Sequence, residues 1–257
     1  MENNSTSPLL RRSPTPLNPS GFELSWSLLF AFGAAAVIVV VLIAFALIAS
    51  SAGLIDVRAR HIAPMALLIG NVAIFVAIGA YALTFLPLLA RRPLRELGIR
   101  AFGWREIGIG VLGAIAMTFV VAALADLMEA LTHHHDTEGA IALLKELHTS
   151  AEAAVFIAMA ALLAPLVEEL AFRVFLFNAF RRYTSVPVAA VLSGILFGMA
   201  HGQSVWQLLT VSVPLAGGGI VLALVYAWSR CYWSNVMTHA LFNAFPLVLF
   251  FVFHVTA

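Results

Sequence analysis

The sequence has little charge and almost no cysteine. Only 11% of its 257 residues are charged, against about 25% in an average soluble domain, whereas 62% are hydrophobic. So few charged side chains cannot cover a water-soluble surface, which excludes soluble enzymes, secreted scaffolds and fibres. The single cysteine, Cys231, cannot form an internal disulfide, and a net charge of +1 provides no basic field for nucleic acid.

Long apolar runs are abundant instead. A helix needs about 20 apolar residues to cross the hydrocarbon core of a bilayer. Seven runs reach or approach this length: Phe22–Ser50, Ala63–Ala90, Ile107–Leu131, Ala151–Phe180, Val186–Ala200, Leu208–Trp228 and Asn235–His254. We therefore predict an all-α fold, a polytopic transmembrane bundle of about seven helices (seven to eight).

The N-terminal residues differ from the rest in composition. Residues 1–21 are rich in Ser, Pro and Asn and cannot bury enough surface to offset chain entropy, so we predict a disordered polar tail. Residues 22–257 then form a single transmembrane domain, with the candidate catalytic helices in about 151–254.

Arginine is distributed unevenly between the loops. Arg91–Arg105 holds five arginines, the densest positive cluster, which predicts a cytoplasmic loop and a cytoplasmic N-terminus; only Arg58 and Arg60 oppose this orientation. The excess of arginine over lysine and the high alanine content suggest a GC-rich bacterial genome. We therefore expect a multi-pass protein of a bacterial inner membrane that contacts lipid.

Three charged residues lie near the middle of the fourth run. An ionisable side chain at mid-membrane costs roughly 2.5 to 3.5 kcal/mol on insertion. A functional or structural role must therefore explain the presence of Glu168, Glu169 and Arg173. Glu169 and Arg173 are four apart with the acid first, the favourable orientation for a salt bridge, whereas Glu168 points about 100° away. We expect Glu168 to face a cavity; the alternative is that both acids share the arginine as a packing clamp.

Two later runs carry further polar residues. His201 ends the sequence FGMAH, and His239 and Asn243 are spaced four apart in HALFNA, on one helix face. A lone histidine in an apolar helix is more often a satisfied core residue than a functional one. Two histidines, an amide and a spare carboxylate together are typical of a catalytic set.

These motifs resemble a known family. EELAFR, FGMAH and HALFN, in this order on successive late helices, are similar to the motifs of the CAAX-protease and bacteriocin-processing (CPBP, or Abi) intramembrane endopeptidases, which include the type II CAAX prenyl endopeptidase. The motifs span about Pro165 to Asn243, and the N-terminal half carries none. The resemblance implies a hydrolase that cleaves a peptide bond of a membrane-associated protein or peptide, possibly a lipidated one.

The resemblance also implies roles for the motif residues. Glu168 would be the general base, and His201 would help to bind and polarise a water. His239 and Asn243 would donate N–H groups to the oxyanion, while Arg173 holds Glu169. A zinc ion bound by Glu168, His201 and His239 is the alternative, although no H-E-x-x-H helix is present. We favour the mechanism without a cofactor.

Other interpretations stay open. Buried charges could relay protons or ions in a transporter, but no internal repeat is visible. A bacteriocin-immunity or scaffold protein of the same family would need no catalysis. Asp126, Glu129 and the His133–Asp136 loop could bind a metal, although a solvated loop is the more common case. Substrate identity and oligomeric state are not encoded in any motif.

The heights of the candidate residues raise a difficulty. With straight helices, and with His201 at the far end of a span of about 16 residues, Glu168, His201 and His239 would differ in height by roughly 10 to 15 Å at 1.5 Å per residue. Straight helices would therefore not bring them together. Tilting, a break at Pro165 or a short fifth helix is needed for convergence.

Overall fold

The computed structural model describes residues 22–56, 61–134, 136 and 143–253. Among these, six helices are long and apolar enough to cross a membrane, judged by length and composition. The prediction of a polytopic helical bundle is thereby confirmed, and the shorter apolar helix α8 (Val186–Met199) brings the total of described candidates to the expected seven. The tail predicted at residues 1–21 lies outside the described residues.

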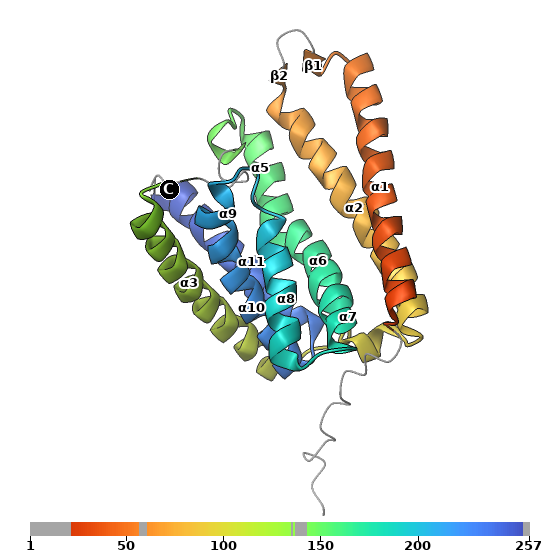
Figure 1. Cartoon of the computed structure of the whole chain (residues 1–257). Helices are drawn as coiled ribbons and strands as arrows, with labels where there is room; N and C mark the ends of the chain where they lie inside the picture. The colour runs from red at the N-terminus through yellow and green to blue at the C-terminus, as the bar shows by residue number, and fades with distance from the viewer. Residues whose placement is uncertain (1–21, 57–60, 135, 137–142, 254–257) are drawn as a thin grey trace, which may run out of the picture.

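The first two long helices form a hairpin beside the rest of the bundle (Figure 1). Helices α1 (Leu24–Ser51) and α2 (Pro64–Ala90) pack on each other. Two short antiparallel strands, β1 (Ile55–Asp56) and β2 (His61–Ile62), join them. Both helices touch the fourth span, α1 through the contact of Phe30 with Phe175, and α2 more extensively, so that α2 supplies one wall of the site.

The remaining spans form a compact group. Helix α3 (Trp104–Thr132) packs on α10 (Ser212–Ser229) and on α11 (Tyr232–Phe253), and α10 packs closely on α8. A Cβ at Gly219 would lie 2.9 Å from the Cα of Gly194, so the glycines allow the α8–α10 backbones to approach. The short helix α9 (Gln207–Thr210) precedes α10.

The fourth span is a composite of α-helical and π-helical segments. It consists of α5 (Ser150–Ala158), the π segment η3 (Met159–Leu163), α6 (Ala164–Glu169), the π segment η4 (Leu170–Phe177) and α7 (Asn178–Arg181). Pro165, in the first turn of α6, has no N–H to donate, which is the local reason for the altered hydrogen-bond pattern before it. π segments are rare and often lie at functional sites.

The turns at one end of the bundle are tied together by hydrogen bonds. The turn between α2 and α3 contains the 3-10 helix η2 (Leu94–Leu97). The hydroxyl of Tyr226 donates to the Leu97 carbonyl at 2.7 Å, and the backbone N–H of Tyr232 donates to the Gly98 carbonyl at 2.9 Å. We call this the arginine-rich end, because the turns there carry Arg91, Arg92, Arg95, Arg100, Arg105, Arg181, Arg182 and Arg230.

Candidate functional site

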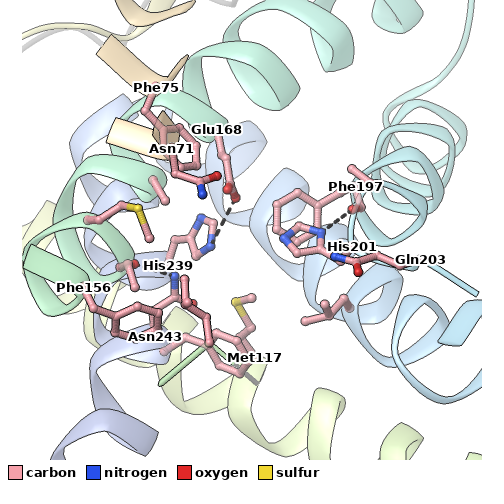
Figure 2. A pocket seen from close by; sticks show the side chains of 17 residues that line it. Asn71, Phe75, Met117, Phe156, Glu168, Phe197, His201, Gln203, His239 and Asn243 are labelled. Atoms are coloured by element: carbon pink, nitrogen blue, oxygen red, sulfur yellow. Dashed lines mark hydrogen bonds and ion pairs between the residues drawn. The ribbon is translucent and has the colours of Figure 1, made fainter. Parts of the chain in front are cut away.

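All four proposed catalytic residues line one pocket of about 350 Å³. Figure 2 shows Glu168 and His239 on one side of this pocket and His201 on the other, with Asn243 below His239. The side chains come from the fourth span, from the turn that follows α8 and from α11. The expected cavity beside Glu168 is therefore present.

The short length of α8 explains why the residues converge. Its 14 residues span about 21 Å, less than the roughly 30 Å hydrocarbon core. His201, just beyond the end of this helix, therefore lies short of the far surface. The candidate residues do line one pocket, and a short fifth helix is one of the features expected from the sequence to bring them together.

Glu169 lies in a buried cluster of polar groups. Both Glu169 and Arg173 are fully buried, and Nη1 of Arg173 lies 3.2 Å from Oε1 of Glu169, as the spacing predicts. Arg173 also donates from Nη2 to the Gly219 carbonyl at 3.0 Å and stacks over the ring of Phe197. The arginine is thus held by three elements, and its charge is balanced by Glu169.

Two further donors reach Glu169 from α11. Nδ1 of His239 lies 2.8 Å from Oε1 of Glu169, and the side-chain amide of Asn235 donates to Oε2. Asn235 is fully buried. We call Glu169, Arg173, Asn235 and His239 the buried charge cluster. Spacing alone indicated only the Glu169–Arg173 pair.

His239 connects the two carboxylates. Its Nδ1 contacts Glu169, and its Nε2 lies 3.7 Å from Oε2 of Glu168. A carboxylate that accepts from Nδ1–H sets the tautomer of a neutral imidazole, so Nε2 then carries the lone pair that faces the pocket. In this arrangement Nε2 donates a hydrogen bond only when His239 is protonated.

Asn243 is oriented by a backbone carbonyl of the π segment. Its Nδ2 donates to the Ala160 carbonyl at 2.8 Å. That carbonyl lacks a helical partner because the Ala164 N–H bonds to Met159 and Pro165 has no N–H. One N–H of the Asn243 amide is used here, which leaves the second for a ligand in the pocket.

His201 is oriented by its own helix. Its Nδ1 lies 2.8 Å from the Phe197 carbonyl, so Nδ1–H is the donor and Nε2 is left with a lone pair. Its ring also packs against Phe197, the residue that lies under Arg173. A histidine held in this way can accept a hydrogen bond from a water in the pocket.

The described residues contain no preformed set of zinc ligands. Within the described ranges, no three His, Cys, Asp or Glu side chains are gathered closely enough to hold a metal ion. The contact of Nδ1 of His239 with Glu169 leaves Nε2 facing the pocket, so it does not itself oppose a metal. As arranged in the described residues, Glu168, His201 and His239 are not gathered into a metal-binding set.

The loop at the end of α3 lies beside α9 and not in the pocket wall. Asp136 accepts a hydrogen bond from the hydroxyl of Thr210 at 3.0 Å, and the ring of His134 lies 4.0 Å from that of Trp206, centroid to centroid. His135 is outside the described residues. The His133–Asp136 segment therefore contacts the segment that follows His201.

Three polar residues near the site were missed by sequence reasoning. Asn235 repeats the spacing of four that links His239 to Asn243, so an N-x-x-x-H-x-x-x-N pattern on one helix face could have indicated it. Asn71, an amide within the apolar second span, lines the pocket and lies beside Glu168 (Figure 2). Gln203 lines it as well, but nothing in the local sequence distinguishes this residue.

Comparison with known proteins agrees with the motifs. Residues 150–245 match the family model described as type II CAAX prenyl endopeptidase Rce1-like. This segment is similar to the Rce1-like endopeptidases. It contains all four proposed catalytic residues and the whole buried charge cluster, and the predicted resemblance is thereby confirmed over this part of the chain.

A curated bacterial protein is also similar. The chain is 23% identical over 149 residues to "Putative membrane peptidase YdiL" of Bacillus subtilis (strain 168). The alignment covers 56% of this chain and 58% of the relative, so the chain spans little more than half the length of the protein it matches. No solved structure matches the chain.

Proposed function

We propose that this protein is an intramembrane endopeptidase that hydrolyses a peptide bond of a membrane-associated protein or peptide, with Glu168 as the general base. The observation that carries the proposal is the contrast between two adjacent acids. Glu169 is neutralised by Arg173 and by donors from α11, whereas Glu168 faces a pocket together with His201, His239 and Asn243. The similarity to the Rce1-like endopeptidases supports the same reaction class.

In the proposed first step, Glu168 takes a proton from a water in the pocket while the water oxygen bonds to the carbonyl carbon of the substrate. Nε2 of His201 accepts the second hydrogen of this water and orients it. The carbonyl oxygen becomes an oxyanion, and the free N–H of Asn243 donates to it. Nε2 of His239, which lies beside Glu168, adds a second donor when it carries a proton.

In the second step, the tetrahedral intermediate collapses. The C–N bond breaks, and the proton that Glu168 accepted is transferred to the leaving amine. The products are one chain with a new carboxyl group and one with a new amino group. Within the pocket these roles require only residues of this chain.

A transporter is disfavoured by the packing beside the cavity. On the arginine-rich side of the site lie Val174, Phe177 and Tyr226, each at most 1% exposed. The polar groups among them, the Tyr226 hydroxyl and the Asn178 amide, are hydrogen-bonded to each other and to backbone carbonyls. An alternating-access or channel mechanism needs a route to both faces. A packed group between the pocket and the arginine-rich end fits a reaction site better than a transport route.

The proposal includes a location. The arginine-rich end faces the cytoplasm by the positive-inside rule, so the N-terminus is cytoplasmic, in a bacterial inner membrane. The partners are membrane lipid and a peptide substrate, which can be lipidated, and no nucleic acid is involved.

The test is cleavage of a quenched fluorescent peptide library, including a farnesylated CAAX peptide, by purified protein in detergent. Glu168→Ala and His201→Ala should abolish cleavage and leave the protein folded, while Glu96→Ala, at an exposed site far from the pocket, serves as the matched control. A zinc chelator should leave the activity unchanged. Loss of activity with the chelator would replace the glutamate mechanism by a metal mechanism, and an intact protein without activity would favour an immunity or scaffold function.

A further inference from the structure

The pocket has one exposed end, which lies away from the arginine-rich end. Three of its lining residues, Asn71, Ala200 and Gln203, are exposed. Gln203 follows the end of α8, and Asn71 lies two turns from the start of α2, next to β2. In Figure 1 the starts of α2 and α5 lie at the end of the molecule opposite the turn between α7 and α8. The exposed end of the pocket is therefore opposite the arginine-rich end.

The other end of the pocket is closed by packing. Behind Glu168, Glu169 and Arg173 are fully buried and do not line the pocket. Beyond them lie Val174, Phe177 and Tyr226 in one hydrophobic cluster that also includes Leu97 of the arginine-rich turn. A peptide could reach Glu168 from this side only if the cluster were unpacked, which would expose several large apolar side chains and a buried ion pair.

The short helix α8 is the reason for this asymmetry. The chain must fill the hydrocarbon core over its whole thickness. Helix α8, which begins at Val186 near the arginine-rich end, spans only about 21 Å of it. The remaining depth above its last residue is occupied by the turn at residues 200–206 and by α9. The residues of this turn that line the pocket, His201 and Gln203, therefore stand between Glu168 and the surface on that side.

The distribution of basic residues assigns the two ends of the bundle to opposite sides of the membrane. The turns at the arginine-rich end carry eight arginines. The connections at the other end carry three basic residues, namely Lys145 and, between β1 and β2, Arg58 and Arg60, which lie outside the described residues. Because cytoplasmic loops are enriched in Lys and Arg, eight against three places the arginine-rich end in the cytoplasm.

We infer that the substrate enters this pocket from the extracytoplasmic side of the membrane. The inference rests on the proposed peptidase function and adds the side from which that site is reached. Its substrate class is an exported peptide or the outer juxtamembrane segment of a membrane protein. A chain anchored by a lipid to the cytoplasmic face would meet the packed, arginine-rich end and not the pocket.

The orientation is tested first by cysteine labelling. Cys231 is the chain's one cysteine and is fully buried, so Cys231→Ser provides a background without thiols. Val205→Cys, at a position that is 78% exposed beyond α8, and Ser185→Cys, exposed at the start of α8, probe the two ends of the same helix. A membrane-impermeant maleimide should label Val205→Cys in intact spheroplasts and Ser185→Cys only in inverted vesicles. The reverse pattern would overturn the inference.

The side of cleavage is tested second. Quenched fluorescent peptides coupled to a dextran that cannot cross a membrane are added to sealed spheroplasts and to inverted vesicles that contain the wild type or Glu168→Ala. We expect cleavage dependent on Glu168 in spheroplasts and its loss in inverted vesicles. Cleavage only in inverted vesicles would overturn the inference and leave the proposed function intact. If neither preparation cleaves the peptides and detergent-solubilised protein is also inactive, the proposed function fails, and the inference fails with it.

Discussion

Glu168 and Glu169 are adjacent in the chain but lie in two different regions of the molecule. Glu169 belongs to the buried charge cluster, where an arginine, an amide and an imidazole surround one carboxylate without exposed surface. The side chain of Glu168 is 18% exposed and faces a pocket. The comparison shows that two adjacent acids of one membrane helix can lie in two environments, one buried among donors from other helices and one at the edge of a pocket.

The largest expected effect is at Glu168, where a substitution should strongly reduce activity without lowering stability. Glu168→Gln keeps the shape of the side chain but removes the base, so cleavage should fall by about 10²- to 10⁴-fold. The thermal midpoint should stay at the wild-type value, because the charge balance of the buried cluster is unchanged. Peptide cleavage and thermal unfolding of the same preparation measure both. A strongly lowered midpoint would show that Glu168 also belongs to the packing cluster.

At Glu169 we expect the opposite result. Glu169→Leu leaves Arg173 buried without its counter-charge, which should lower the free energy of unfolding by about 3 to 5 kcal/mol. The double variant Glu169→Leu/Arg173→Leu should recover part of this loss, since it removes both charges. Denaturant unfolding of the three proteins in detergent is the measurement. Equal stability of the double variant and Glu169→Leu would contradict the assigned pairing.

A smaller effect is expected at Asn235, which touches Glu169 but does not line the pocket. Asn235→Leu removes a buried hydrogen bond to a charged acceptor and should cost about 1 to 3 kcal/mol. Because Glu169 then holds His239 less firmly, we expect a lower kcat with an unchanged KM. Asn235→Asp should be more damaging, since it brings a second carboxylate to Glu169. A change confined to KM would place Asn235 in substrate binding instead.

The smallest effect is expected at an exposed ion pair with the same spacing. Arg92 and Glu96 are four residues apart and 2.7 Å from each other, but their side chains are about one-third exposed. Glu96→Leu should therefore change the free energy of unfolding by about 0.5 kcal/mol or less. Measured beside Glu169→Leu, it isolates burial as the cause of the difference. A loss of several kcal/mol here would mean that the spacing, and not the environment, determines the cost.

Much of the fold could be predicted from the sequence because apolar length is a local property. The seven apolar runs correspond to the six long helices and to α8, and the boundaries agree to within a few residues. The spacing of Glu169 and Arg173 predicted their ion pair for the same reason, since two residues four apart on a helix must face the same way. The motif residues of the pocket were likewise visible as polar side chains in apolar helices.

Contacts between segments that are distant in the chain could not be predicted from such local sequence patterns. The sequence determined the membrane class, the number of spans and the one buried pair within a single helix, because these follow from composition and helical period. Only the tertiary structure decided that His239 links both carboxylates, that Asn235 holds Glu169 and that Asn71 joins the pocket wall. These contacts depend on where α8 stops, on the π segments around Pro165 and on the approach of α2 and α11, and such distances between helices are not encoded in the periodicity of any one of them.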